Sequence, residues 1–230
     1  MITEPDSFRA AAQSGRLKIL LLIVCGLLLG IQAAQAGTRL VTRVYDGDTL
    51  RLEGGRVLRL YGLDTPEMGK KSQYFAVAAK KALSELVLNR QVEVVEVGEG
   101  RDRFGRTLAI VILPDQQVVN ELLLRGGYAF YFPHPDKRKR FVDHERFLSA
   151  QRQAMEAEQG FWPEIFSLCT GMVHGNWRSR RFHLPSCHYA RSVSSRNRRI
   201  FSSLKDAFYA GFAPCRECTP WPMEKTASRD

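Results

Sequence analysis

Short β-type runs separated by tight-turn dipeptides dominate the first half of this chain. Positions 38–45, 49–52 and 57–60 are rich in apolar and β-branched residues, and Asp46-Gly47 and Gly54-Gly55 stand between these runs. Such dipeptides between strand-like runs are strong hairpin signals. Similar runs at 92–97 and 107–113 bring the predicted strands to five. Five short strands joined by hairpin turns predict a small barrel of the OB type.

Helical spacing of apolar residues predicts that helices accompany the barrel. Phe75, Ala79, Leu83 and Leu86 recur at helical spacing within 72–88, where Ser72 and Asn89 are suited to the two ends. Further helices are predicted at 118–125, before Gly126-Gly127, and at 141–159, before Gly160. The predicted class is therefore mainly β with helices (α+β), a five-stranded OB-fold barrel packed with about three helices.

The first 36 residues have the pattern of a secretory signal peptide. Arg16 and Lys18 precede an apolar run at 19–31, and Ala34-Gln35-Ala36 follows it. The run has 13 residues, whereas a helix that crosses a bilayer needs about 20. We expect cleavage after Ala36 and export to the periplasm or the medium. The alternative is an uncleaved segment that anchors the protein in the membrane.

The positive charge of the chain is concentrated near its C-terminus. The 230 residues include 34 Lys and Arg against 24 Asp and Glu, a net charge of +10. Residues 37–173 hold 20 basic and 18 acidic residues (+2), whereas residues 174–220 hold 9 and 2 (+7). A basic segment favours partners that carry phosphate. We therefore divide the chain into a signal segment (1–36), a barrel domain (37–165), a basic Cys/His module (170–220) and a tail (221–230).

Carboxylates and arginines gather at the predicted strand ends. The carboxylates are Asp48, Asp64 and Glu67, and the arginines are Arg59 and Arg106. Hard divalent cations take carboxylate oxygens as ligands, and a carboxylate also orients or deprotonates water. Guanidinium groups bind phosphate oxygens and stabilise charge that builds up on phosphorus. Each residue alone is compatible with a turn or a surface position, but their joint occurrence indicates phosphoryl chemistry.

Three ordered blocks resemble the staphylococcal nuclease (thermonuclease) family over about residues 39–162. They are Asp46-Gly47-Asp48-Thr49, then Arg59 followed by Asp64-Thr65-Pro66-Glu67, and Asp102-Arg103-Phe104-Gly105-Arg106. The stretch Val119-Asn120-Glu121-Leu122 adds to the resemblance. The family implies an OB-fold barrel, in agreement with the predicted strands. It also implies hydrolysis of DNA or RNA at the bond to the 5′ oxygen, which leaves 3′-phosphate ends.

The resemblance assigns roles to individual residues. It implies that Asp48, Asp64 and the Thr65 carbonyl oxygen bind a catalytic calcium ion. It implies that Glu67 activates or orients the attacking water, and that Arg59 and Arg106 bind the scissile phosphate and stabilise the five-coordinate transition state. The residues that stack on the nucleotide base, and a preference for DNA or RNA, do not follow from the sequence.

The C-terminal module has paired ligands at metal-site spacing. His183-Leu-Pro-Ser-Cys187 and Cys215-Arg-Glu-Cys218 would form a closed structural zinc site with one histidine and three cysteines. A disulfide framework that includes Cys169 is the alternative, because exported proteins meet oxidising conditions, and His188 is a rival ligand. The stretches 182–187, 201–203 and 210–218 resemble the metal-binding module of Ada-type DNA-repair proteins, which have a cysteine where this chain has His183.

The basic residues of the module predict binding to nucleic acid through phosphate contacts. Including one arginine of the third block, the predicted contacts are Arg103, Arg178, Arg180, Arg181, Arg198 and Arg199. The whole pattern predicts an exported, calcium-dependent endonuclease that acts on DNA, RNA or both. The alternative function is that of a non-catalytic, exported nucleic-acid-binding protein. No protein partner is implied.

Overall fold

A computed structural model describes residues 37–68, 75–102, 104–133, 144–168 and 171–219, and the described residues from Arg39 onward belong to one compact unit. The predicted signal segment and the tail lie outside the described residues, as do Ser72, Arg103 and Cys169. No helix among the described residues is both long and apolar enough to cross a membrane.

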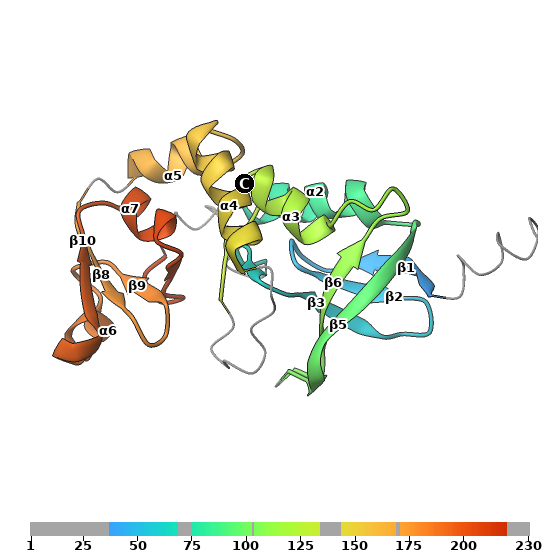
Figure 1. The fold of residues 1–230 in the computed structure, drawn as a ribbon, viewed down its shortest axis with the longest axis horizontal. Coiled ribbons are helices and arrows are strands. Elements are labelled where there is room, and N and C mark those ends of the chain that lie inside the picture. Colours follow the sequence, from blue (N-terminus) through green and yellow to red (C-terminus); the bar gives the residue numbers. More distant parts are fainter. Residues whose placement is uncertain (1–36, 69–74, 103, 134–143, 169–170, 220–230) are drawn as a thin grey trace, which may run out of the picture. The chain divides into compact units, whose positions relative to one another are not determined.

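Five strands form a ring close to the bounds predicted from the sequence (Figure 1). In ring order they are β1 (Thr38–Val44), β2 (Thr49–Leu52), β3 (Val57–Leu60), β6 (Thr107–Ile112) and β5 (Gln91–Arg101). β1, β2 and β3 pair as antiparallel hairpins, and β3 pairs with β6 in parallel. The Val41 N–H donates to the Arg90 carbonyl (3.0 Å), which joins the two ends of the ring. The OB-type, mixed α+β arrangement is confirmed.

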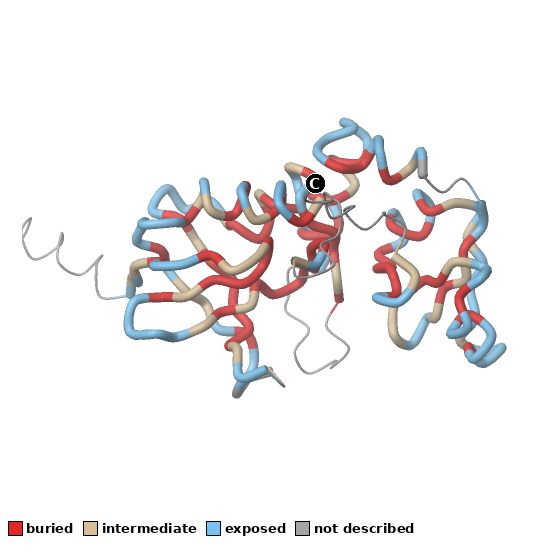
Figure 2. Tube along the Cα trace, turned by 180° about the vertical axis from the view of Figure 1, so that it is seen from behind, coloured by how far each residue is buried: buried red, intermediate tan, exposed pale blue. Residues whose placement is uncertain are grey.

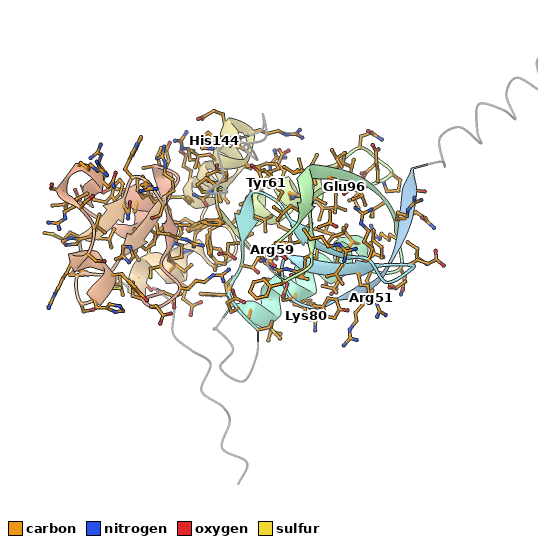
Figure 3. The ribbon with its side chains drawn as sticks, turned by 90° about the horizontal axis from the view of Figure 1, so that it is seen from below. Arg51, Arg59, Tyr61, Lys80, Glu96 and His144 are labelled. Atoms are coloured by element: carbon orange, nitrogen blue, oxygen red, sulfur yellow. The ribbon has the colours of Figure 1, made fainter. Side chains whose placement is uncertain are left out.

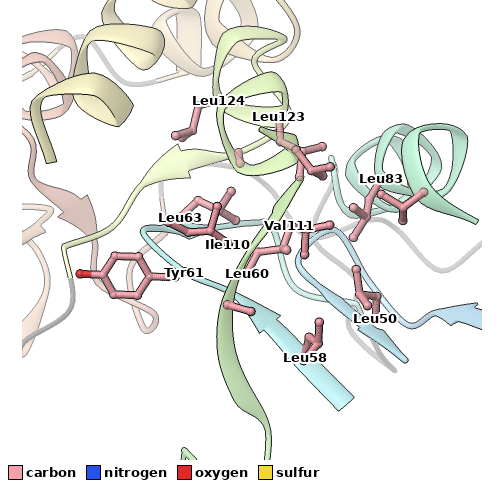
Figure 4. Close-up of a cluster of buried hydrophobic side chains, with 14 of the residues drawn as sticks. Leu50, Leu58, Leu60, Tyr61, Leu63, Leu83, Ile110, Val111, Leu123 and Leu124 are labelled. Atoms are coloured by element: carbon pink, nitrogen blue, oxygen red, sulfur yellow. The ribbon is translucent and has the colours of Figure 1, made fainter. Parts of the chain in front are cut away.

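The core of the barrel lies between these strands and two helices, α2 (Ala76–Val87) and α3 (Val119–Arg125). Leu50, Leu58 and Leu60 are buried because alternate side chains of a strand share one face. They point toward Leu83 of α2 and Leu123 of α3 (Figure 4). Burial of each leucine side chain contributes about 2 kcal/mol to stability.

Helix ends follow the sequence signals in part. After α2, Asn89 takes the left-handed backbone (φ 59°), as expected of a residue that ends a helix. The next long helix, α4 (His144–Glu156), ends before the predicted residue 159. Gly127 and Gly160, both with positive φ, pack backbone against backbone, and a Cβ on Gly127 would lie 2.2 Å from the Gln159 carbonyl oxygen. This close approach fixes the end of α3 against the turn after α4.

The segment after Gly160 forms a helix that the sequence analysis did not predict, α5 (Trp162–Leu168). The last helix predicted for the barrel domain ends before Gly160. Pro163 instead occupies the first turn of α5, where a proline does not remove a helical hydrogen bond. A short pair, β4 (Leu63–Asp64) with β7 (Phe130–Tyr131), lies next to the ring.

The C-terminal module consists of a small sheet and short helices. Its sheet has the order β10 (Arg198–Phe201), β8 (Val173–Asn176), β9 (Arg181–His183) and β11 (Ala213–Pro214). The helical pieces are α6 (His188–Arg191), a 3-10 turn (Ser195–Asn197) and α7 (Leu204–Tyr209). Ser203 caps the start of α7, where its hydroxyl accepts a hydrogen bond from the Asp206 N–H (3.1 Å). Strands of two to four residues are too short to show a periodic pattern.

A second hydrophobic cluster joins β7, α4 and α5 to the module. It contains Phe130, Trp162, Phe182 and Phe208. Figure 2 shows buried residues in red in both the barrel and the module. The buried Gln151 of α4 accepts a hydrogen bond from the Tyr131 N–H (2.6 Å) and donates one to the Phe208 carbonyl (2.8 Å). The module therefore shares a packed and hydrogen-bonded core with the last helices of the barrel domain.

Candidate active site

Two buried aspartates converge on one arginine at the end of β3. Arg59 lies near the end of that strand (Figure 3). Its Nη1 forms an ion pair with Asp48, and its Nη2 lies 2.6 Å from Asp64 Oδ1. The two carboxyl side chains are 3% and 5% exposed and the arginine side chain is 12% exposed. Such burial strengthens charge-assisted hydrogen bonds, so this triad has a well-defined geometry.

The loop between β1 and β2 brings Asp48 to this position. The Asp48 N–H donates to the Asp46 side chain (3.0 Å), which forms a local turn. A Cβ on Gly47 would lie 2.7 Å from the Ala79 Cβ, so the loop approaches α2 as closely as a glycine allows. Asp48 then accepts hydrogen bonds from the hydroxyls of Thr49 and Thr65, both at 3.0 Å.

Asp64 is surrounded by positive charge. Pairing of β4 with β7 places Asp64 opposite Phe130, and Arg59, Arg181 and Arg216 face its carboxylate. Burial raises the pKa of Asp64, but these three guanidinium groups outweigh that effect and hold the pKa below its usual value. Asp64 is therefore ionised at neutral pH.

Glu67 lies at the rim of the same site. Its side chain is 54% exposed, and Arg216 Nη2 lies 3.7 Å from its Oε1. Partial burial and the charge of Asp64 raise the pKa of Glu67, and Arg216 and Arg59 offset this in part. A carboxylate with a raised pKa is a better proton acceptor than an ordinary one.

Arg106 is held by Asp102 at the start of β6. The Arg106 Nε and Nη2 lie 2.9 and 2.8 Å from Asp102 Oδ2, and the Arg106 N–H donates to Asp102 Oδ1 (2.9 Å). Arg106 Nη1 also donates to the Thr49 hydroxyl (3.0 Å), which in turn donates to Asp48. Sequence reasoning placed Asp102 within a motif without a role, and the structure shows it as a positioning residue for Arg106.

Two open cavities meet at these side chains. One has a volume of about 580 Å³, and its lining includes Arg59, Arg106, Phe104, Phe132, Arg181 and Arg216. The other, of about 320 Å³, is lined by Asp46, Arg59, Glu67, Phe104, Arg106 and Arg216. The structure thus brings together the predicted residues Arg59, Glu67 and Arg106 beside Asp48, Asp64 and Thr65. Their chemical roles stay predictions.

The oxygen donors beside Arg59 suit a hard cation. Asp48 and Asp64 both direct carboxylate oxygens at the same positive group, the guanidinium of Arg59. The Thr65 side chain is hydrogen-bonded to Asp48, so its backbone lies next to the pair. Carboxylate and carbonyl oxygens are the ligands that Ca²⁺ prefers. The oxygen atoms of these residues are therefore suitable ligands for the predicted calcium ion.

The four predicted ligands of the module form a compact cluster. The ligand atoms of His183, Cys187, Cys215 and Cys218 all lie within 4.8 Å of one another. Tetrahedral zinc with Zn–S bonds of about 2.3 Å would separate its ligands by about 3.8 Å, and Cys187 Sγ lies 3.7 Å from His183 Nδ1. The three described cysteines form no disulfide. His188, the rival ligand, is outside the cluster.

The predicted nucleic-acid contacts of the module fall into two groups. Arg180 stacks on Trp177, its Cζ 3.8 Å from the ring centroid, and Arg199 approaches the same ring at 5.2 Å. Arg178 and Arg198 are exposed on the same module. Arg181, in contrast, stacks on Phe132 at 3.8 Å and reaches Asp64.

Arg216 was not predicted as a functional residue. It lies inside the Cys215–Cys218 loop, which the sequence analysis interpreted solely as a metal motif. The one sequence signal for Arg216 is its position between two proposed metal ligands. Ligands on both sides of a residue would fix the position of its backbone.

Comparisons with known proteins agree with this geometry. The sequence model described as "Staphylococcal nuclease homologue" matches residues 57–164. A thermonuclease of Staphylococcus hyicus is 32% identical over 142 residues, which cover 58% of this chain and 80% of that protein. A micrococcal nuclease of Shigella flexneri is 30% identical over 135 residues, 54% of this chain and 72% of its own length. An uncharacterized endonuclease of Haemophilus influenzae is 32% identical over 153 residues, 64% and 79% of the two chains.

The matched residues 57–164 contain Arg59, Asp64, Glu67 and Arg106. The chain belongs to the staphylococcal nuclease family.

Proposed function

We propose that this protein is an endonuclease that hydrolyses phosphodiester bonds of DNA, RNA or both, requires calcium and leaves 3′-phosphate ends. The observation that carries the proposal is the shared cavity of Arg59, Glu67 and Arg106 beside the Asp48–Asp64 pair. The similarity to a thermonuclease and a micrococcal nuclease supports a nuclease.

In the proposed reaction, Arg59 and Arg106 donate hydrogen bonds to the scissile phosphate, and Glu67 accepts a proton from the attacking water. The water oxygen bonds to phosphorus, the bond from phosphorus to the 5′ oxygen breaks, and that oxygen leaves with a proton from solvent. Calcium held by Asp48, Asp64 and the Thr65 carbonyl would supply positive charge beside the phosphate. Arg59 must exchange a carboxylate for the phosphate, whereas Arg106 stays held by Asp102.

We also propose that His183, Cys187, Cys215 and Cys218 hold a structural zinc ion. Burial of three of these residues and the mutual proximity of the four ligand atoms support it. Burial lowers the pKa of His183, and the nearby Arg181 lowers it further, so the imidazole is neutral, as a ligand must be. Export through the segment 1–36 and nucleic-acid contacts by Arg103, Arg178, Arg180, Arg181, Arg198 and Arg199 complete the proposal.

The competing function is nucleic-acid binding without cleavage. The purified protein is incubated with end-labelled DNA and RNA in calcium or in a chelator, and the fragment ends are mapped. We expect fragments in calcium that end in 3′-phosphate, and intact substrate in the chelator. Binding without fragments in calcium would favour the competing function, and fragments with 3′-hydroxyl ends would refute the proposed bond cleavage.

A further inference from the structure

Two arginines of the C-terminal module reach the candidate active site of the barrel. Arg181 Nη2 lies 3.5 Å from Asp64 Oδ2. Arg216 Nη2 lies 3.7 Å from Glu67 Oε1 and 4.0 Å from Asp64 Oδ1. Both side chains line the cavity of about 580 Å³ together with Arg59 and Arg106. The module therefore contributes to the wall of this cavity.

Arg181 is held in place before any substrate arrives. Its Nη1 donates to the Pro214 carbonyl (2.7 Å), and its Cζ lies over the Phe132 ring, 3.8 Å from the ring centroid. The side chain is 18% exposed. A guanidinium fixed in this way loses little conformational entropy on binding an anion.

Arg216 combines a fixed backbone with an accessible side chain. The Cys215 N–H donates to the Phe182 carbonyl (2.9 Å), and Cys215 and Cys218 on either side belong to the Cys/His cluster. The side chain itself is 48% exposed and lines both cavities. The module can thus aim this charge at the site while its own core stays packed.

The four arginines follow one another along the cavity wall. Arg106 reaches Thr49 at one side, and Arg59 comes next, because it contacts both Asp48 and Asp64. Arg181 and Arg216 instead lie at the Asp64 and Glu67 side, next to the contact with Phe132. Arg59 and Arg106 are the arginines proposed to bind the scissile phosphate. Arg181 and Arg216 are therefore available to bind a neighbouring phosphate of the same strand.

We propose that Arg181 and Arg216 bind the phosphate adjacent to the scissile one, so that the module forms part of the substrate-binding surface of the nuclease. This proposal rests on the proposed function, because it concerns the substrate of the same site. It gives Arg181 and Arg216 a different role from Arg180 and Arg199, which lie around Trp177.

The test compares two substrates with the full-length protein. A dinucleotide has one phosphodiester and no neighbouring phosphate, whereas a tetranucleotide has phosphates on both sides of its central bond. Removal of one charge-assisted hydrogen bond costs about 1.5–3 kcal/mol, or about tenfold to a hundredfold. We expect Arg181→Ala and Arg216→Ala to lower kcat/KM for the tetranucleotide by this factor and for the dinucleotide by less than about threefold.

Two further variants separate this role from others. Arg216→Lys keeps a charge and should recover part of the lost activity on the tetranucleotide. Arg196→Ala removes a charge from an exposed position of the same module that lines neither cavity. It should leave kcat/KM unchanged for both substrates. Equal losses on both substrates, a gain of activity, or lower unfolding temperature with unchanged kinetics would each overturn the proposal.

Failure of the proposed function itself has a different signature, since the wild-type protein would then cleave neither substrate. In that case binding of a labelled tetranucleotide, measured by fluorescence anisotropy in calcium-free buffer without a chelator, tests the two arginines. The proposal expects about tenfold weaker binding in either alanine variant. Unchanged binding would overturn it.

Discussion

The barrel site and the C-terminal module use arginine in different ways. In the barrel, Arg59 and Arg106 are each paired with aspartates, and residues 37–173 have a net charge of +2. In the module, Arg180 and Arg199 stack around Trp177, and residues 174–220 have a net charge of +7. Paired arginines have fixed directions, as catalysis requires, whereas clustered ones raise affinity for a polyanion.

Arg181 and Arg216 combine features of the two regions. They belong to the module in sequence, yet their carboxylate contacts are with Asp64 and Glu67. Net charge alone therefore indicates that the module is a nucleic-acid-binding surface. The contacts of Arg181 and Arg216 with Asp64 and Glu67 indicate that part of this surface faces the barrel site. If the two regions depend on each other, substitutions in one should alter the behaviour of the other.

The largest effect should follow from Arg59→Ala in the barrel. The change removes a phosphate ligand and leaves Asp48 and Asp64 without their common partner. We expect cleavage to fall about 10⁴-fold and the free energy of unfolding to fall by about 3–5 kcal/mol, measured by urea unfolding in a chelator. Arg51→Ala, on the neighbouring strand β2, is the control (Figure 3). If the Arg59→Ala protein were as stable as the wild type, the triad of Asp48, Arg59 and Asp64 would contribute little to stability.

Cys215→Ser tests the module. Loss of one ligand should abolish zinc binding, since the remaining three residues no longer close a tetrahedral site. Metal analysis should find about one zinc ion per wild-type chain and none in the variant, and the variant should cleave the tetranucleotide about tenfold more slowly because Arg216 loses its fixed backbone. Ser186→Ala, at an exposed position next to Cys187, serves as the control. Wild-type protein without zinc would contradict the assignment.

Gln151→Leu breaks the connection between the regions. It removes the side-chain partner of the buried Tyr131 N–H and of the Phe208 carbonyl, which keeps its hydrogen bond from the Gly211 N–H (2.9 Å). Each lost hydrogen bond is worth about 1 kcal/mol, so the free energy of unfolding should fall by about 1–3 kcal/mol in a single urea transition. Gln153→Leu, at an exposed position of the same helix, should have little effect. Two separate transitions in the wild-type protein would show that the regions fold independently.

The smallest effect concerns the salt dependence of binding. Removal of Arg180 and Arg199 together should weaken binding of duplex DNA in a chelator and flatten the slope of log K against log salt by about 2, one unit for each lost phosphate contact. The double variant of the exposed barrel residues Arg39 and Arg90 removes the same charge. Equal flattening in both double variants would mean that total charge, and not the surface around Trp177, sets the affinity.

Much of the barrel could be predicted from the sequence because its signals are local. Turn dipeptides and strand runs located all five ring strands, and the blocks around Asp48, Asp64 and Arg106 lie in loops at strand ends. The helix α5 was missed because Pro163 also ends helices, and the sheet of the module because its strands are too short. The contacts of Arg181 and Arg216 depend on tertiary packing through Phe208 and Gln151, which leaves no periodic signal.

Single-turnover cleavage of one labelled oligonucleotide by the wild-type protein and by Glu67→Gln tests the nuclease assignment most directly. Glu67 is 54% exposed, so the substitution should leave the urea midpoint unchanged. Loss of a general base costs about 10²- to 10⁴-fold, and we expect cleavage in calcium to slow by about 10³-fold. A folded Glu67→Gln protein that cleaves within a few-fold of the wild-type rate would contradict the account.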